Sequence, residues 1–460
     1  MEKALDILIM AAGLGTRMKS NRAKVLHEVD GRPLINPVVE TALTLGPKSV
    51  CVIVGHQADE VKAAVTAEFP DERVCFALQE NQLGTGDAIN STRELYSRSQ
   101  GNIVVLTGDV PLITAETIRA LVNKHDQDRA ASTLLSVRLA DPTGYGRVVR
   151  NKDGTFEKIV EQKDASDIEK QIDEINAGFY CFSPFKLYEA LSRLSNQNAQ
   201  GEFYLTDIPG ILKSDGEQIG VCTASDAAEV EGVNDRRQLA QMEKVIRRRT
   251  VERLMLESGV TFIDPKAVYI SARASIGRDT VICPNVTIEG NTVIGDACTI
   301  RPGVRIANSI IGNGVEIKDN TYITDSTVGD DCSVGPMAHL RGHAVMADKA
   351  KVGNFVELKK TTLGKGSKAS HLTYLGDATI GEKTNIGAGT ITCNYDGVNK
   401  HATVIGDNVK IGSDTMLVAP ITVGDGAVTG AGSVVTRDIA PNKLAVGAPA
   451  RAIKTVTGDK

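Results

Sequence analysis

The chain has 460 residues, which suggests two or three domains that can each bury a core. Its formal net charge is only -5 and it has no tryptophan, so neither a basic stripe nor an aromatic platform points to nucleic acid, and a small-molecule role is favoured. Its 8 scattered cysteines form no C-x-x-C pair, and no stretch reaches the roughly 20 apolar residues that span a bilayer. We therefore expect a cytoplasmic protein with free thiols, no structural zinc and no membrane span.

Residues 1–233 have the alternating pattern of an α/β domain. Aliphatic runs at 7–9, 50–54, 103–106 and 134–137 predict buried strands, and the stretches 37–45 and 87–97 predict helices. This alternation predicts a mainly parallel, Rossmann-like sheet that is covered on both faces. Residues 234–259 predict a linker helix, because Met242, Ile246 and Leu254 recur at helical spacing among many charges.

A glycine-containing loop follows the first predicted strand, with Gly13, Gly15 and Arg17 in it and Lys24 shortly after. Glycines let the backbone approach a phosphate chain, and exposed N–H groups then bind the anion. The loop is not a dinucleotide fingerprint, because Met18 stands at the third glycine position, and no Walker sequence follows. On this motif alone, a structural strand-to-helix turn explains the loop equally well.

Asp109 follows the third of these strands, at the carboxyl edge where open α/β sheets bind ligands. Mg2+ usually takes one or two protein oxygens and completes its shell with phosphates and water, so a single carboxylate suits it. A helix or turn cap would use the same residue. The segment Leu83-Gly84-Thr85-Gly86 offers a second close backbone approach, suited to a nucleobase.

The C-terminal part, residues 260–460, has an aliphatic residue at every sixth position over long stretches. The register consists of Ile276, Ile282, Ile288, Ile294, Ile300 and Ile306, then Ile311, Ile317, Ile323, Val328, Val334 and Leu340, and later Ile405, Ile411, Leu417 and Val423. An interval of six fits neither a helix nor a half-buried strand and is typical of a hexapeptide β-helix. Glycines often follow the aliphatic residue, and we expect them to form tight corners between the faces. Residues 393–402 interrupt the hexads and predict a projecting loop.

Polar and basic residues gather at 353–374 and 385–396 more densely than the stacking of coils requires. His371 lies in this cluster, and an imidazole can accept a proton near neutral pH. A lone histidine is more often structural than catalytic, so the cluster alone leaves both interpretations open.

Several motifs, in this order, resemble those of the sugar-phosphate nucleotidyltransferases: Gly13-x-Gly15-Thr16-Arg17-Met18 with Lys24, Gln79 with Gly84-Thr85, Gly108-Asp109, Gly144-Tyr145-Gly146-Arg147 and Glu231-Gly232-Val233-Asn234. Together with the solenoid they resemble the family of bifunctional N-acetylglucosamine-1-phosphate uridyltransferases and glucosamine-1-phosphate acetyltransferases, over nearly the whole chain. The resemblance implies a uridyltransferase domain at 1–233, a linker helix at 234–259, and at 260–460 a left-handed parallel β-helix with acetyltransferase activity. It also implies a homotrimer that supplies UDP-N-acetylglucosamine for peptidoglycan and lipopolysaccharide.

By this resemblance, the N-terminal site transfers a uridylyl group from UTP to N-acetylglucosamine 1-phosphate with the help of Mg2+. Lys24 and Arg17 would hold the triphosphate, and Asp109 and Asn234 would ligate the metal ion. The rest of the nucleotide would contact Ala11, Ala12, Gly13, Gln79, Gly84 and Thr85, and the amino sugar would contact Gly146, Glu161, Asn176 and Asn234. No side-chain nucleophile is required, because the sugar phosphate is already anionic and catalysis rests on positioning and charge neutralisation.

The resemblance implies that the C-terminal site transfers an acetyl group from acetyl-CoA to glucosamine 1-phosphate. His371 would take a proton from the 2-amino group, with Glu357 or Asn394 orienting the imidazole. The sugar phosphate would contact Arg341, Lys359, Tyr374 and Asn385, and acetyl-CoA would contact Ala388, Asn394, Tyr395, Ser413 and Ala431. Two departures stand out: Leu340-Arg341-Gly342-His343 replaces the family's Leu-Arg-Pro-Gly, and the tail lacks the arginine expected at the CoA phosphate, leaving Arg451 or Lys454 to substitute.

Two other interpretations remain. A pyrophosphorylase of the ADP-glucose type would perform one reaction and use its solenoid for oligomerisation and regulation, which the cluster around His371 disfavours. A noncatalytic scaffold resembling the nucleotide-exchange subunits of translation factors would not need Lys24, Asp109 and Asn234, yet all three chemical types are present.

Overall fold

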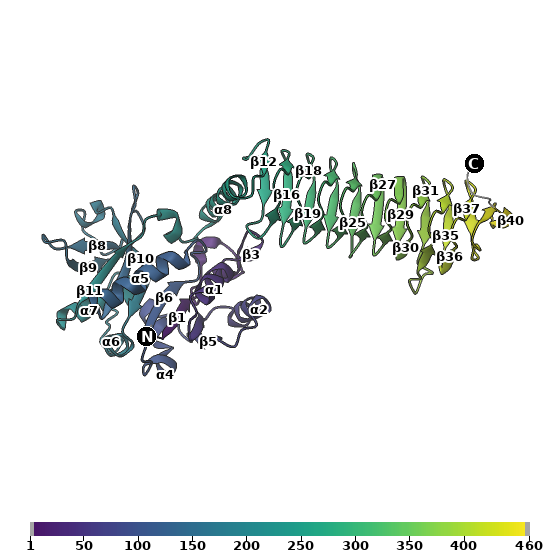
Figure 1. Cartoon of the computed structure of the whole chain (residues 1–460). Coiled ribbons are helices and arrows are strands. Elements are labelled where there is room, and N and C mark those ends of the chain that lie inside the picture. The colour runs from purple at the N-terminus through teal and green to yellow at the C-terminus, as the bar shows by residue number, and fades with distance from the viewer. Residues whose placement is uncertain (1–3, 456–460) are drawn as a thin grey trace. The chain divides into compact units, whose positions relative to one another are not determined.

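The computed structural model describes residues 4–455 and divides into two compact units between Val245 and Ile246. The N-terminal unit is an α/β domain whose sheet has the strand order β11-β7-β10-β6-β1-β4-β5, with β8 beside β10 and β9 beside β8 (Figure 1). Its strands are β1 Leu5–Met10, β4 Ser49–Val54, β5 Val74–Leu78, β6 Asn102–Thr107, β7 Ser132–Arg138, β8 Arg147–Arg150, β9 Phe156–Val160, β10 Glu174–Phe182 and β11 Ile219–Thr223. The small strands β2 Glu28–Val29 and β3 Arg32–Pro33 form a separate hairpin.

The predicted mainly parallel sheet is confirmed. Strand β1 pairs in parallel with β4 and β6, β4 with β5, and β7 with β11, whereas β10 runs antiparallel to β6 and β7. Successive residues of a strand point to opposite faces, so Ile7 and Ile9 enter one hydrophobic core and Leu8 enters the other. Both faces are therefore covered, by helices α1 Ile35–Thr44, α2 Ala58–Glu68, α3 Thr85–Asn90, α4 Arg93–Tyr96, α5 Ala115–Asp128, α6 Pro184–Leu191 and α7 Ile208–Ser214.

One predicted helix is interrupted. The stretch 87–97 forms the end of α3 and then the separate short helix α4. Thr92 lies at the break, is fully buried, and donates its hydroxyl to the Ile89 carbonyl (2.6 Å) while also contacting the Tyr188 hydroxyl (2.7 Å). Such side-chain bonding to a nearby carbonyl competes with the helical pattern, and it is invisible to apolar periodicity.

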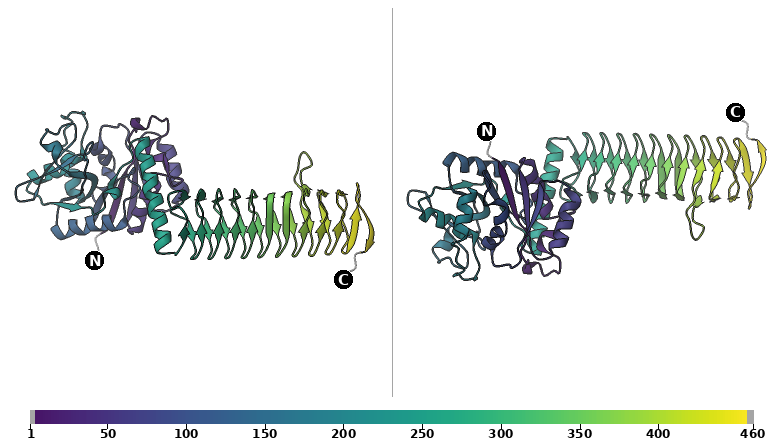
Figure 2. Two further views of the ribbon diagram at one scale, coloured as in Figure 1. Left: turned by 90° about the horizontal axis from the view of Figure 1, so that it is seen from above. Right: turned by 90° about the horizontal axis from the view of Figure 1, so that it is seen from below.

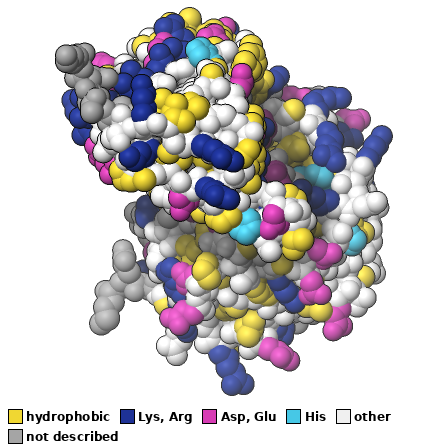
Figure 3. Space-filling model, turned by 90° about the vertical axis from the view of Figure 1, so that its right-hand side faces the viewer, with side chains coloured by type: hydrophobic (Ala, Val, Ile, Leu, Met, Phe, Trp, Pro, Cys, Tyr) yellow, Lys and Arg dark blue, Asp and Glu magenta, His cyan; other side chains and the backbone are white. Residues whose placement is uncertain are grey.

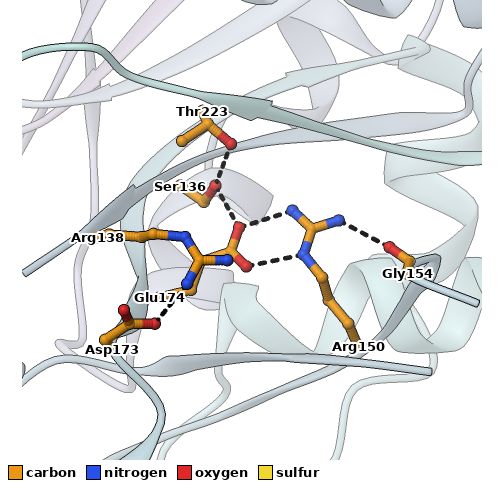
Figure 4. Close-up of polar contacts among 7 residues, drawn as sticks. All are labelled: Ser136, Arg138, Arg150, Gly154, Asp173, Glu174 and Thr223. Atoms are coloured by element: carbon orange, nitrogen blue, oxygen red, sulfur yellow. Dashed lines mark hydrogen bonds and ion pairs between the residues drawn. The ribbon is translucent and has the colours of Figure 1, made fainter. Parts of the chain in front are cut away.

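An ion pair with a buried carboxylate connects strands in the antiparallel part of this sheet (Figure 4). Glu174 of β10 accepts hydrogen bonds from Arg150 of β8, with distances of 2.7 and 2.6 Å, and from Ser136 of β7, at 2.7 Å. The Ser136 hydroxyl in turn lies 3.2 Å from the Thr223 hydroxyl of β11. Burial alone would raise the pKa of Glu174, but the hydrogen bonds from Arg150 and Ser136 and the Arg150 charge outweigh it, so the pKa lies below its usual value.

Helix α8, Arg236–Leu256, begins in the first unit and ends in the second. Met242 is buried, and Val251 and Leu254 belong to the core of the C-terminal unit. The helix lies within the predicted linker segment 234–259.

The C-terminal unit is a left-handed parallel β-helix, as predicted. Its strands pair in parallel from coil to coil and form three stacks, one on each face, which run along the unit (Figure 1). Most are two or three residues long, from β12 Thr261–Phe262 and β13 Val268–Ile270 to β37 Val428–Thr429 and β38 Val434–Val435. One stack comprises β14 Ser275–Ile276, β17 Val293–Ile294, β20 Ile310–Ile311, β23 Thr327–Val328, β26 Val345–Met346, β28 Thr362–Leu363, β30 Ala378–Ile380, β33 Thr403–Ile405 and β36 Ile421–Val423.

Every aliphatic residue of the predicted register is buried, with at most 3% of its surface exposed. The register also continues where no hexads were predicted, through Met346, Val352, Leu358, Leu363, Ala369, Leu375, Ile380 and Ile386, all equally buried. Two strands there are unusually long, β27 Lys351–Lys359 and β29 Lys368–Gly376, each with nine residues. Figure 2 shows the predicted loop projecting from the coils after β32 Ile391–Cys393.

Glycine is required after the register residues for a different reason from the tight corners that were expected. Gly277, Gly295 and Gly312 do not have positive φ, but a Cβ on each would collide with an Asp or Asn side chain of the next coil. Those side chains accept backbone N–H groups across the coils, as Asp296 does from Arg278 (3.0 Å). Glycine is needed because the next coil occupies the space of a side chain.

The last two strands close the stack. Strand β39, Lys443–Val446, continues the parallel pairing, whereas β40, Arg451–Thr455, runs antiparallel to it.

Candidate functional sites

The loop after β1 has the geometry of a phosphate-binding loop. Ala11 and Ala12 are buried, and the Ala11 N–H donates to the Ile53 carbonyl (2.9 Å), which fixes the start of the loop. A side chain on Gly13 would meet nothing within 4 Å, so this backbone is open to a ligand. Gly15 has a φ of +59°, and a Cβ there would lie 2.6 Å from the Lys24 Cβ. Glycine is thus required at residue 15 both for its conformation and for the approach of Lys24.

Four predicted residues meet beside this loop. Lys24 Nζ donates to Asp109 Oδ2 (2.5 Å) and to Asn234 Oδ1 (3.2 Å), and the Arg17 guanidinium donates to the same Asn234 oxygen (2.8 Å). The Lys24 and Asp109 side chains are only 19% and 14% exposed, so water screens the pair weakly. The structure brings these groups together although Arg17 and Asn234 are 217 residues apart in sequence.

The segment that carries Asn234 is held against Asp109 by its backbone. The Val233 N–H donates to the Asp109 carbonyl (2.9 Å), and a Cβ on Gly232 would lie 3.4 Å from Asp109 Oδ2. Asn234 is further fixed by its N–H, which donates to the Gln238 side chain at the start of α8 (2.7 Å).

The oxygens of Asp109 and Asn234 fit a magnesium ion that takes most of its ligands from a bound triphosphate. Within residues 4–455, no group of three or more His, Cys, Asp or Glu side chains could hold a metal by itself. A Mg2+ ion at Asp109 and Asn234 would take its remaining ligands from phosphates and water.

The second glycine-containing segment forms a rigid edge. The Gln79 amide donates to the Gly84 carbonyl (3.1 Å) and to Asp87 (2.7 Å). Gly84 has a φ of +122° and its Cβ position is blocked by the backbone of Phe203, while the Thr85 hydroxyl accepts from the Leu205 N–H (3.0 Å). These bonds immobilise the predicted nucleobase contacts at the N-terminus of α3.

Three of the predicted amino-sugar contacts lie together. The Asn176 N–H donates to the Gly146 carbonyl (2.9 Å), and a Cβ on Gly146 would lie 3.3 Å from the Glu161 carboxylate. Burial, and the nearby charges of Asp207 and Asp164, raise the pKa of Glu161. Tyr145, which was not singled out, links this group to the charged centre: burial and the charges of Glu231 and Asp109 raise its pKa.

In the solenoid, several candidates form one row along a corner. His371, Ala388, Ser413 and Ala431 each directly precede a residue with positive φ, namely Leu372, Gly389, Asp414 and Gly432. Backbone bonds connect the row, with the Asp414 N–H donating to the Ala388 carbonyl (2.6 Å) and the Gly432 N–H to the Ser413 carbonyl (2.8 Å). The exposed His371 is therefore followed along the corner by three small residues, which leave space for an extended ligand.

The predicted sugar-phosphate contacts divide between two faces of the solenoid. Arg341 of β25, His339–Arg341, pairs in register with Lys359, and Glu357 pairs in register with Tyr374. Asn385 of β31, Asn385–Ile386, instead pairs with Lys368, six residues before Tyr374 and beyond the corner at Leu372. One copy of the chain thus brings Arg341, Lys359 and Tyr374 together but not Asn385.

The projecting loop adds a residue that the sequence did not reveal. Lys359 lies near Lys400, and its positive charge lowers the pKa of Lys400. Two adjacent ammonium groups favour an anion between them. The available signal was the position of Lys400 within the loop that interrupts the hexads, five residues after Tyr395.

Both predicted partners of the imidazole are hydrogen-bonded to other side chains. Arg341 donates to Glu357 (2.7 and 2.6 Å), and the Asn394 amide donates to Asp377 (2.5 Å). The Nδ1 atom of His371 lies instead 2.6 Å from Oδ1 of Asn354.

On the face shown in Figure 3, basic and acidic side chains are interspersed among hydrophobic and other polar ones. Among the described residues, no helix is both long and apolar enough to cross a membrane.

Comparison with known proteins gives matches in both units. Residues 7–200 match the model of the MobA-like NTP transferase domain, residues 259–362 that of the GMPPB C-terminal domain, and residues 402–437 that of the bacterial transferase hexapeptide with six repeats. The protein named Bifunctional protein GlmU of Syntrophomonas wolfei subsp. wolfei is 46% identical over 442 residues, 96% of this chain and 97% of that protein. Proteins of the same name from Trichlorobacter lovleyi and Geobacillus sp. are 47% and 48% identical, over 97% and 95% of this chain and 96% and 94% of their own lengths.

Proposed function

The chain belongs to the GlmU family of bifunctional uridylyltransferases and acetyltransferases, and from this premise we propose which residues perform each reaction. In the α/β unit, the phosphate of N-acetylglucosamine 1-phosphate attacks the α-phosphorus of UTP and releases pyrophosphate. The convergence of Lys24, Arg17, Asp109 and Asn234 beside the glycine-containing loop carries this proposal.

Lys24 and Arg17 act on the triphosphate. Both side chains donate to protein oxygens in this structure, and the anionic oxygens of a bound triphosphate would accept hydrogen bonds from the same donors. Asp109 and Asn234 would hold Mg2+, which supplies charge neutralisation on the phosphates when it is bound. Once these groups are bound to the phosphates, they stabilise the charge that develops in the transition state.

The remaining contacts place the two substrates in line. Ala11, Ala12, Gly13, Gln79, Gly84 and Thr85 bind uracil and ribose, and the rigidity of the loop and of the α3 N-terminus supports this role. Gly146, Glu161, Asn176 and Asn234 bind the amino sugar.

In the solenoid, His371 accepts the proton of the 2-amino group of glucosamine 1-phosphate as that nitrogen attacks the thioester of acetyl-CoA. Its exposure, and its place in one row with Ala388, Ser413 and Ala431, support a groove for the coenzyme beside the base. Arg341, Lys359, Tyr374 and Lys400 bind the sugar phosphate, and Asn394 and Tyr395 contribute to the acetyl-CoA site.

The functional assembly is a cytoplasmic homotrimer. Asn385 lies beyond the corner from Arg341, Lys359 and Tyr374, which supports a sugar-phosphate site that a second copy of the chain completes. The product, UDP-N-acetylglucosamine, feeds cell-wall synthesis.

One experiment tests the whole proposal. The purified chain is assayed for acetyl transfer from acetyl-CoA to glucosamine 1-phosphate and, separately, for pyrophosphate release from UTP with N-acetylglucosamine 1-phosphate. Both reactions should proceed. Uridylyl transfer without acetyl transfer would support a pyrophosphorylase with a regulatory solenoid, and neither activity would support a scaffold.

A further inference from the structure

Within the part of the chain that the structure describes, the imidazole of His371 has one side-chain hydrogen-bond partner, and it is a neutral amide. Asn354 Oδ1 lies 2.6 Å from His371 Nδ1, and the two residues are register partners on the adjacent parallel strands β27 and β29. An amide oxygen can only accept, so Nδ1 carries the hydrogen of this bond. In the neutral imidazole, Nε2 is then left with a lone pair.

The backbone on both sides fixes this pair. Immediately before it, a Cβ on Gly353 would collide with the Ser370 carbonyl oxygen, so the two coils touch there through their backbones. Immediately after it, Phe355 and Leu372 have φ values of 56° and 48°, a conformation that bulky residues rarely adopt. The Thr373 hydroxyl also donates to the His371 carbonyl (2.6 Å).

This conformation is unfavourable, because the left-handed region crowds the Cβ of any residue other than glycine. Two consecutive coils have this conformation at the same corner: Phe355 directly follows Asn354, and Leu372 directly follows His371. Asn354 and His371 are thereby held at hydrogen-bonding distance by constraints that do not depend on their own side chains.

The carboxylates of this region are engaged elsewhere. The Glu357 carboxylate accepts two hydrogen bonds from Arg341, and the Asp377 carboxylate accepts a hydrogen bond from the Asn394 amide. Whether the partner of Nδ1 is a carboxylate or an amide affects the chemistry of the ring. A carboxylate would stabilise the imidazolium, whereas a neutral amide orients the ring without adding a charge.

We propose that Asn354 is the positioning residue of the acetyltransferase: it holds Nδ1–H of His371 and presents the free Nε2 to the amine of the substrate. This rests on the proposed role of His371. In the step, the amine nitrogen bonds to the thioester carbonyl carbon and the C–S bond breaks. Nε2 takes the proton from nitrogen and passes it on, and the leaving thiolate ends as the free thiol of CoA.

Steady-state acetyl transfer by the full chain tests the proposal. Asn354→Ala should lower kcat by roughly 10-fold or more, yet less than His371→Ala does, with little change in KM, because only the orientation of the base is lost. Asn354→Asp should keep the orientation but move the acid limb of the pH profile to higher pH, since the new carboxylate favours the charged ring. A purely structural role would not produce that shift. Uridylyl transfer by the same variants, and Asn291→Ala on an exposed position of an earlier coil, are the controls.

The outcomes separate the two assignments. If His371→Ala remains active, the base is elsewhere and the proposed function of this site fails. If His371→Ala is inactive while Asn354→Ala and Asn354→Asp match the wild type in kcat and pH profile, Asn354 has no positioning role. If Asn354→Ala does not fold, the pH profile of Asn354→Asp decides alone: a shifted acid limb supports the proposal, and an unshifted one overturns it.

Discussion

Replacing Lys24 by methionine should remove most uridylyl transfer and leave acetyl transfer unchanged. Methionine keeps an unbranched stem against Gly15 but removes the ammonium that bonds to Asp109 and Asn234. The acetyl-transfer residues all belong to the other compact unit, so no charge there is altered.

The expected size follows from the surroundings of Lys24. Its side chain is 19% exposed and that of Asp109 is 14% exposed, so the ammonium acts where screening by water is weak. Loss of one fixed donor from such a site lowers kcat by about 100- to 1000-fold, or about 3–4 kcal/mol of transition-state stabilisation. Arg17 remains bonded to Asn234 and limits the loss, so the variant should retain measurable activity.

The assay follows pyrophosphate release and free-thiol release in the same preparation, with thermal unfolding to verify folding. Lys152→Met, on the exposed turn after β8, is the matched control and should change neither rate. An equal loss of both activities in a folded Lys24→Met protein would refute the independence of the units. Unchanged uridylyl transfer would show that Lys24 has no role in that reaction.

Four further outcomes are expected. Asp109→Asn, or chelation of Mg2+, should stop uridylyl transfer alone, because only that reaction needs the triphosphate charge neutralised; activity that persists in excess chelator would exclude the metal ligands. His371→Ala should lower acetyl transfer by roughly 100-fold or more, and alanine variants of the three other solenoid histidines should remain active. An active His371→Ala protein beside an inactive variant of another histidine would show that the general base is not His371. Light scattering should give a trimer, and a mass near one 48.9 kDa chain with full acetyl transfer would contradict it. Glu174→Gln should lower the free energy of unfolding by about 1–3 kcal/mol at pH 7. The folded protein holds the pKa of Glu174 below its unfolded value of about 4.3. The stability difference between wild type and Glu174→Gln should therefore be fully present above pH 4.3 and should shrink as the pH falls through the folded pKa. Denaturation curves that give the same stability difference at every pH would refute this prediction.

The fold was largely predictable because its signal is repetitive. Each solenoid coil must bury one aliphatic residue per face, so residues such as Ile276 and Ile282 specify the architecture by spacing alone. The register was harder to follow between Leu340 and Ile405 because Met346 and Ala369 occupy two of its buried positions and the projecting loop lengthens the interval before Ile405. The break at Thr92 could not be predicted either, since it depends on Tyr188 across the fold.

The candidate sites were less accessible to sequence reasoning. The meeting of Arg17, Lys24, Asp109 and Asn234 follows from resemblance to a family and not from spacing, because the segments are joined only in the folded sheet. Asn354 was missed for a local reason. The corner beside it carries Phe355 in a conformation usually taken by Gly, Asn or Asp, so the sequence does not reveal that Asn354 and His371 occupy equivalent positions one coil apart.

The antiparallel strand β40 bears on polymerisation. A stack of parallel coils ends in unpaired backbone groups on which the first coil of another molecule could continue the ladder, which would build a filament. Strand β40 lies across that end with the opposite polarity and carries Arg451 and Lys454. An incoming parallel coil would meet a strand that runs in the opposite direction and bears two exposed cationic side chains. The end of the solenoid is thus protected from end-to-end growth by the direction of one five-residue strand.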